Sequence, residues 1–147
     1  MLNADHGMAL SVFSALVTAS SLTDPVSCVI SSLSAAYGPL HFGATQSAQA
    51  ALMEIESPEN VASFMDQVKS GKRTLFGYGH RSYKGVADPR MPFVKSILSD
   101  MSGYTKGNPL FKVAQRIEQM ASSDDYFTSR GLFPNADFYG HFIFTGM

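Results

Sequence analysis

Four times along this chain, a residue whose side chain can cap a helix stands directly before a proline. The pairs are Asp24-Pro25, Ser57-Pro58, Asp88-Pro89 and Asn108-Pro109. A side-chain oxygen at the N-cap accepts a hydrogen bond from a free amide of the first turn, and proline is tolerated there because it has no amide hydrogen to place. Each pair is therefore predicted to begin a helix, which makes a chain of helices joined by turns.

Apolar residues recur at helical spacing after each of these pairs and in three further segments. The predicted helices cover residues 8–21, 24–38, 42–55, 57–70, 88–101 and 108–120, and a last apolar segment follows residue 135. Residues 72–85 are predicted to form a loop with a short extended piece at 74–76. Six or seven helices with almost no strand indicate an all-α protein.

The charges are unevenly placed. Between Gly7 and Met53 the only charged side chain is Asp24, whereas all 11 Lys and Arg residues lie between Lys69 and Arg130. Uncharged helices rich in small residues are expected to pack inside a larger protein or against another subunit. A membrane span is disfavoured because serine and threonine dilute the apolar run and Asp24-Pro25 ends it.

The composition excludes several classes of protein and of site. A net charge of -1 over 147 residues gives no support for nucleic-acid binding through overall charge. Cys28 is the only cysteine, so no internal disulfide can form, and a buried reduced thiol is expected. The histidines do not have the spacing of metal ligands, and no serine lies in a nucleophile elbow. No metal site is expected.

Two histidines lie next to glycines, where a backbone can approach a ligand closely. His41 follows Gly38-Pro39 at a predicted helix N-terminus, and either donates a hydrogen bond to a ligand or merely caps the helix. His80 ends the segment Gly77 to His80 and is followed by the cations Arg81, Lys84 and Arg90. That segment is either an anion site or an ordinary solvated basic loop.

Three more ionisable side chains are candidates for a chemical or a structural role. Asp137 stands between Asn135 and two aromatic residues, where loss of solvation would make a carboxylate a better base; the alternative is simple N-capping by Asn135 or Asp137. His6, beside Asp5, is either a ligand contact or a capping partner. His141 has no motif around it and is expected to be structural.

Taken together, four ordered segments resemble the motifs of the citrate synthase family. They are Leu2 to Gly7, Gly38 to Ala44, Gly77 to Arg81 with Asp88 to Arg90, and Pro134 to Tyr139. The resemblance implies the family's all-α helical fold. It also implies a Claisen-type condensation of an acyl-CoA, acetyl-CoA in the first place, with oxaloacetate, followed by thioester hydrolysis to citrate and CoA.

The resemblance also implies a role for each matching residue. Asp137 would remove the proton α to the thioester carbonyl, His41 would hydrogen-bond the enolate oxygen, and His80 would protonate the oxaloacetate carbonyl. His6 and Arg90 would hold oxaloacetate. A CoA contact is expected from Tyr78, Gly79, Arg81 and Lys84. No cofactor is implied, because the CoA thioester is a substrate.

The family enzyme is two to three times longer, so the chain is expected to be a fragment of a homodimeric parent. Its parts would be large-domain-type helices with the histidine motifs (1–56), a small helical domain (57–133) and the truncated start of a returning helix (134–147). Residues 1–9 lack the basic residues of a targeting peptide. The family implies an intracellular enzyme, which is mitochondrial, peroxisomal or cytoplasmic.

Phe42 stands where the family commonly has glycine, and His80 and Arg90 lie ten positions apart, one more than the commonest pattern. Phe42 keeps a second substrate class open, a longer acyl-CoA as used by 2-methylcitrate or alkylcitrate synthases. A third alternative is a non-catalytic fragment that binds CoA or a subunit.

Overall fold

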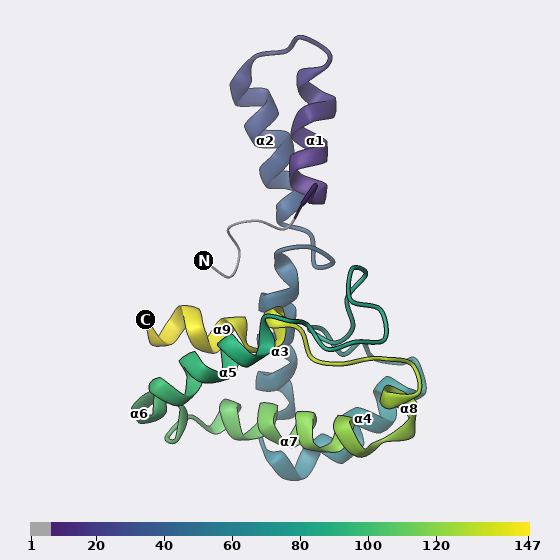
Figure 1. The fold of residues 1–147 in the computed structure, drawn as a ribbon, viewed down its shortest axis with the longest axis vertical. Coiled ribbons are helices and arrows are strands. Elements are labelled where there is room, and N and C mark those ends of the chain that lie inside the picture. Colours follow the sequence, from purple (N-terminus) through teal and green to yellow (C-terminus); the bar gives the residue numbers. More distant parts are fainter. Residues whose placement is uncertain (1–6) are drawn as a thin grey trace. The chain divides into compact units, whose positions relative to one another are not determined.

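The computed structural model describes residues 7–147, which form helices and no strand (Figure 1). The chain divides into two compact units, Met1–Ala44 and Thr45–Met147. The all-α prediction is confirmed. None of the helices in residues 7–147 has both the length and the apolarity needed to cross a bilayer.

The described part of the first unit is a helical hairpin of α1 (Leu10–Ala19) and α2 (Pro25–Ala36). Asp24 caps α2 as predicted, because its carboxylate accepts a hydrogen bond from the Ser27 amide at 3.0 Å. Hydroxyl groups join the two helices, with Thr18 Oγ1 donating to Ser31 Oγ at 2.8 Å. The hairpin is therefore held partly by small polar side chains.

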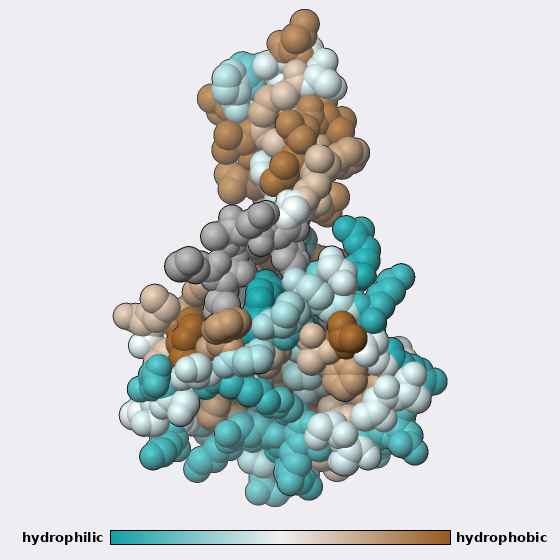
Figure 2. All heavy atoms as spheres, in the orientation of Figure 1, coloured by the Kyte–Doolittle hydropathy of each residue, from teal (hydrophilic) through white to brown (hydrophobic). Residues whose placement is uncertain are grey.

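The large apolar side chains of this hairpin are exposed, as the hydrophobic surface over α1 and α2 shows (Figure 2). The exposed set includes Leu10, Phe13, Leu16, Val26, Ile30 and Leu33. Contiguous apolar surface of this kind marks an interaction site in soluble proteins. The expectation that other protein covers these uncharged helices stays a prediction.

The second unit contains the remaining helices. They are α3 (Gly43–Ile55, which begins at the end of the first unit), the 3-10 turn η1 (Pro58–Asn60), α4 (Val61–Lys69), α5 (Met91–Asp100), α6 (Ser102–Thr105), α7 (Pro109–Ser123), α8 (Asp125–Thr128) and α9 (Ala136–Gly146). Helix α9 packs on α5, and α4 packs on α7. The core holds Leu52, Met65, Val94, Ile117, Phe127, Phe138 and Phe142.

Two predicted helix starts are wrong in detail. The Ser57 side chain caps no helix; residues 58–60 form the 3-10 turn, and α4 begins at Val61. Helix α5 begins at Met91, after a turn in which the Asp88 carboxylate accepts from the Arg90 amide, and that carboxylate also accepts from the Ala136 amide. By contrast, Asn108 caps α7 as predicted.

The extended piece expected at 74–76 is absent. The β-bridge found within residues 7–147 instead pairs Tyr78 with Pro134. The pairing lies at residue 78 instead of 74–76 because the hydrogen-bond partners of this loop are the residues just before α9. These residues form their hydrogen bonds with the glycines of the loop. The proposed division at residues 56 and 133 stays a prediction.

Candidate functional site

The loop before α5 and the start of α9 are joined by backbone hydrogen bonds. The Gly79 amide donates to the Phe133 carbonyl at 2.7 Å, and the Asn135 amide donates to the Gly77 carbonyl at 2.8 Å. The Asn135 side-chain amide also donates to the Gly79 carbonyl at 2.7 Å. These bonds place the segment containing His80 beside the first turn of α9.

Glycine is required at residue 77 of this loop. Gly77 has φ +78°, and a Cβ built on it would lie 2.5 to 2.7 Å from the backbone and Cβ of Phe138. Any side chain would thus meet the start of α9 as well as adopt an unfavourable backbone conformation. The glycine of the sequence motif is explained by this close approach.

Asp137 lies in the first turn of α9 and is half-buried. The capping role belongs to Asn135, whose Oδ1 accepts from the Asp137 amide at 3.0 Å. The Asp137 carboxylate instead accepts a hydrogen bond from Thr45 Oγ1 at 3.3 Å. N-capping of α9 by Asn135 is therefore confirmed, whereas the role of Asp137 as a base stays a prediction.

Asp88 anchors both Arg90 and α9. The Asp88 side chain is buried, and its oxygens accept from the Arg90 guanidinium (Nη2 at 2.7 Å, Nε at 3.0 Å), from the Arg90 amide at 2.9 Å and from the Ala136 amide at 3.0 Å. Burial alone would raise the pKa of Asp88, but these hydrogen bonds outweigh it and hold the pKa below its ordinary value. A charged Asp88 therefore fixes the arginine next to the helix that carries Asp137.

Arg90 also lies within the electrostatic reach of other groups of the loop and of α9. Its pKa is raised mainly by the hydrogen bond to Asp88, with smaller contributions from Tyr83 and Asp137. The Tyr83 ring stacks on the His80 ring, with centroids 4.7 Å apart. The second unit thus brings together the predicted residues His80, Arg90 and Asp137.

Hydrogen bonds hold the rings of two histidines. His80 Nδ1 accepts from the Ser82 amide at 3.1 Å. In the first unit, His41 Nε2 lies 3.4 Å from the Ser11 amide nitrogen and 3.1 Å from Ser11 Oγ. Both contacts of His41 are thus to Ser11 and at one ring nitrogen.

His41 lies two residues before α3, as predicted, and its ring stacks on Phe42 with centroids 4.5 Å apart. Gly43 allows the turn before this helix, because a Cβ there would lie 2.8 Å from the Gly38 carbonyl oxygen. His6 lies outside the described residues. His141 is half-buried beside Phe142, and burial lowers its pKa.

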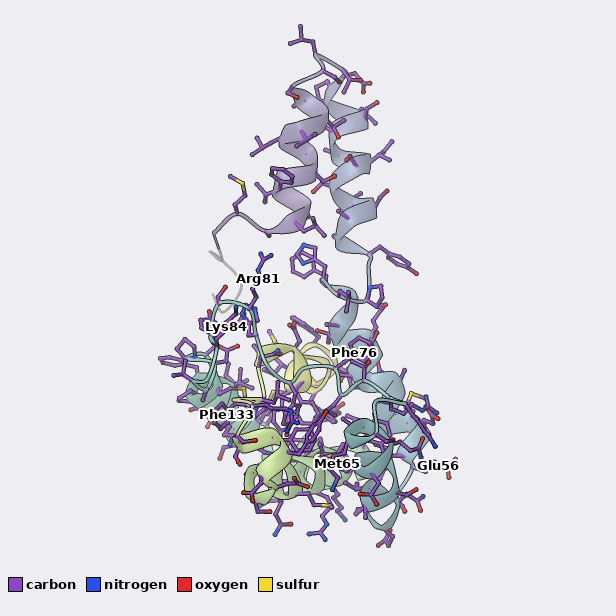
Figure 3. All side chains as sticks on the ribbon, turned by 90° about the vertical axis from the view of Figure 1, so that its right-hand side faces the viewer. Glu56, Met65, Phe76, Arg81, Lys84 and Phe133 are labelled. Carbon is purple, nitrogen blue, oxygen red and sulfur yellow. The ribbon has the colours of Figure 1, made fainter. Side chains whose placement is uncertain are left out.

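The predicted CoA contacts differ in exposure. Arg81 and Lys84 extend from the loop and are exposed (Figure 3). The Tyr78 ring packs edge-on against Phe127 and Phe138, and its hydroxyl is buried without a hydrogen-bond partner in residues 7–147. Burial, followed by the charge of Glu118, raises the pKa of Tyr78. The Tyr78 hydroxyl is therefore not exposed to a ligand, and the expected CoA contacts stay a prediction.

Three residues of this site were missed in the sequence: Asp88 as an anchor, and Thr45 and Ser11 as partners of Asp137 and His41. The Asp-Pro-Arg order was a usable signal for Asp88, since an aspartate readily accepts from the amide two residues on. No sequence signal marks the other two. In the described part of the chain, no cluster of side chains could hold a metal ion.

Comparison with known proteins extends these observations. The family model described as "Citrate synthase, C-terminal domain" matches residues 1–147. The chain is 51% identical to the alkylcitrate synthase phiJ of a fungus (Fungal sp.) over 98% of its length, and 39% identical to a citrate synthase of Dictyostelium discoideum over 100%. It covers 31% and 28% of these two proteins, so it spans about a third of such relatives.

A solved structure has the same fold. It is the ternary complex of carboxymethyl coenzyme A and oxaloacetate with citrate synthase from Thermoplasma acidophilum. The TM-score is 0.85 at 33% identity, and the match covers 99% of this chain and 38% of that one. The similarity therefore extends over both units of the chain but over a minor part of each known protein.

Proposed function

Because the chain belongs to the citrate synthase family, we propose that it carries the proton-transfer residues for condensing an acyl-CoA with oxaloacetate. The observation that carries the proposal is the joining of the Arg90 loop to the first turn of α9 through Asp88. This arrangement holds a cation for an anionic substrate near the half-buried carboxylate of Asp137. A base and a substrate anchor in one rigid frame suit carbon–carbon bond formation.

In the proposed first step, the Asp137 carboxylate takes the proton α to the thioester carbonyl, and the electron pair moves to the thioester oxygen. A ring N–H of His41 donates to that oxygen, which stabilises the enolate. Ser11 supports this role, because its amide and its hydroxyl contact the ring at Nε2 and hold it in place. A hydrogen-bond donor is needed here because the α-proton is only weakly acidic.

In the second step, the enolate carbon attacks the keto carbon of oxaloacetate. His80 Nε2–H protonates the carbonyl oxygen as the new bond forms, and Arg90 and His6 hold the oxygens of oxaloacetate. Water then hydrolyses the thioester and releases CoA, whose phosphates are proposed to pair with Arg81 and Lys84. The proposed reaction uses side chains, the acyl-CoA, oxaloacetate and water, so it calls for no metal or prosthetic group.

A specific observation favours a second candidate substrate, an acyl-CoA longer than acetyl-CoA. Two relatives named alkylcitrate synthases are 51% and 49% identical to the chain, above the 39% of a relative named citrate synthase. Phe42 beside His41 differs from the family's common glycine and supports a reshaped acyl site. Acetyl-CoA and a longer acyl-CoA are therefore compared directly in the test.

The test is oxaloacetate-dependent thiol release from acetyl-CoA and from hexanoyl-CoA. It is measured on a chimera in which this chain replaces the matching segment of the alkylcitrate synthase relative, because the chain spans 31% of that protein. We expect release that requires oxaloacetate and is lost in the Asp137→Asn chimera. A folded chimera without release, or one in which Asp137→Asn changes nothing, would refute the proposed roles.

The apolar surface of α1 and α2 supports a proposed partner, a second copy of the parent protein or another part of it. The surface is uncharged apart from Asp24. Replacing Leu16 and Ile30 by glutamine should reduce association of the chimera in analytical ultracentrifugation. Unchanged association would place the contact elsewhere.

A further inference from the structure

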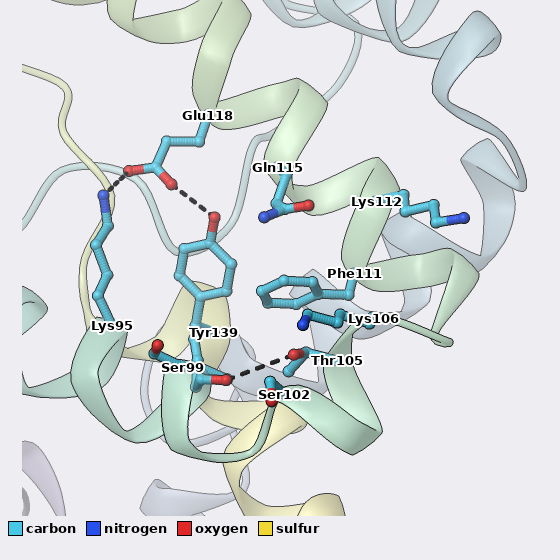
Figure 4. Close-up of a pocket in the computed structure, with 11 residues that line it drawn as sticks. Lys95, Ser99, Ser102, Thr105, Lys106, Phe111, Lys112, Gln115, Glu118 and Tyr139 are labelled. Atoms are coloured by element: carbon cyan, nitrogen blue, oxygen red, sulfur yellow. Dashed lines mark hydrogen bonds and ion pairs between the residues drawn. The ribbon is translucent and has the colours of Figure 1, made fainter.

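A groove of about 590 Å³ lies on the second unit, between α5, α6, α7 and the side chain of Tyr139 (Figure 4). We call it the α5–α7 groove. Its wall is mostly apolar, formed by Leu98, Phe111, Tyr139 and the methylene chains of lysines. A volume in this range suits a small molecule. None of the residues proposed above for catalysis or CoA binding lines it.

The electrostatics of the groove favour an anion. Three lysines line it against one glutamate, Glu118, and this carboxylate is already paired with Lys95 Nζ at 2.6 Å. Within residues 7–147, neither Lys106 nor Lys112 lies within ion-pair distance of a carboxylate. The ammonium of Lys106 lies beside Phe111, whereas that of Lys112 points away from the rings (Figure 4), so Lys106 supplies the groove's positive charge that no carboxylate of the described chain neutralises.

The aromatic side chains of the groove are fixed in place. Tyr139 donates its hydroxyl hydrogen to Glu118 Oε2 at 2.6 Å, which joins α9 to α7. Phe111 packs edge-on against Phe142 of the core, with centroids 5.2 Å apart, and is tilted against Tyr139 at 5.9 Å. Tyr139 is 2% exposed and backs the wall, so the partly exposed Phe111 ring offers the face on which a flat ligand can pack without ordering new side chains.

Hydroxyl groups complete the lining at the α5–α6 end. Thr105 Oγ1 points to the carbonyls of Leu98 and Met101, so its hydrogen is used within the fold. The Ser99 and Ser102 side chains also line the groove and are within reach of solvent. Serine hydroxyls and lysine ammonium groups are donors that suit an anion with several oxygens.

We propose that the α5–α7 groove is a second ligand site, which takes a small aromatic anion. The flat body packs on Phe111, which Tyr139 backs, and Lys106 pairs with the anionic group. The anion is a phosphate or a carboxylate, since lysine acts as a point charge towards both. This site is separate from the one proposed for acyl-CoA and oxaloacetate.

The probe is 1-naphthyl phosphate, followed by its own fluorescence anisotropy on the full chain, which contains no tryptophan. We expect a saturable rise, with 1-naphthoate binding within about tenfold of the phosphate. Neutral 1-naphthol and inorganic phosphate should each bind at least roughly tenfold more weakly, because each lacks one half of the recognition. Equal binding of naphthol would show adsorption to apolar surface and overturn the proposal.

Matched variants locate the probe. Lys106→Glu should weaken binding by roughly tenfold or more, whereas Lys72→Glu, which makes the same change in net charge on an exposed loop, should have little effect. Glu118→Gln should strengthen binding about two- to fivefold, because it removes the groove's negative charge and keeps the side-chain shape. Equal effects of the two lysine variants, or weaker binding by Glu118→Gln, would overturn the assignment.

Competition separates this site from the CoA loop. Saturating CoA with oxaloacetate should leave the probe bound, and an Arg81→Ala, Lys84→Ala double variant should bind it normally. Displacement by CoA together with loss of binding in the double variant would assign the probe to the CoA loop and refute the groove.

Discussion

Replacing Asp88 by asparagine removes the charge that ties Arg90 to α9 while keeping the side-chain volume. The Asp88 side chain is 1% exposed, and its oxygens accept from four donors: three on Arg90 and the amide of Ala136. In asparagine one oxygen becomes an NH₂ group. At least two of these donors then face another donor, and the arginine loses its ion-pair partner.

The cost follows from these contacts. A buried donor left without an acceptor costs about 1–3 kcal/mol, and loss of one partner of a buried ion pair costs about 3–5 kcal/mol. The Arg90 side chain is 16% exposed, so water offsets part of this loss. We therefore expect the free energy of unfolding to fall by about 3 kcal/mol, and the Tm by roughly 10 °C.

The measurement is urea and thermal unfolding of the chain by circular dichroism, with Asp100→Asn as the control. Asp100 is exposed at the end of α5, so its substitution should change the free energy of unfolding by less than about 0.5 kcal/mol. An equally small change for Asp88→Asn would refute the anchoring role of Asp88.

The same variant has an expected pH signature. Because the folded-state pKa of Asp88 lies below the ordinary 3.8, its charge stabilises the fold above that pH, and this stabilisation is lost as pH falls through the folded-state pKa. The difference in stability between wild type and Asp88→Asn should be full near pH 6 and shrink below about pH 4. A difference that grows on acidification would contradict a charged Asp88.

Gly77→Ala should lower the free energy of unfolding by roughly 3 kcal/mol, because of backbone strain and collision with α9. Gly103→Ala should be tolerated, because there is open space around the new methyl group. Equal Tm values of the two variants would refute the close approach of Gly77 to α9. In the chimera, Asp137→Asn should abolish thiol release and leave CoA affinity unchanged by titration, with Asp125→Asn in the first turn of α8 as the active control. Arg90→Leu should weaken oxaloacetate binding by roughly tenfold or more while CoA binding changes less; an unaffected oxaloacetate affinity would place the anion site elsewhere.

Much of the fold could be predicted because helix starts are local events. Asp24 and Asn108 cap helices through amides two or three residues away, so residue order alone indicates the bond. Ser57 failed as a cap, because the chain forms a 3-10 turn before α4. The Asn60 side-chain amide donates to the Ile55 carbonyl at the end of the preceding helix. Helix propensity does not take such a contact into account, so it could not predict the turn.

The candidate site also has features that the sequence predicted and features that it could not predict. The types and order of the motif residues were enough to identify the family, because each motif is contiguous in the chain. The sequence could not show that Asn135 rather than Asp137 caps α9, or that the Tyr78 hydroxyl is buried. Both depend on how the loop and α9 pack together.

By itself, then, the sequence determined where most helices begin, that the protein is all-α, and to which family it belongs. Only the tertiary structure decided that Asp88 is the anchor of the site and that the Tyr78 ring packs against the core residues Phe127 and Phe138. The reason is the length of chain between partners: Asp88 reaches the Ala136 amide across 48 positions, and Asn135 reaches the Gly79 carbonyl across 56. Such bonds form only when packing of the whole second unit has brought the two segments together.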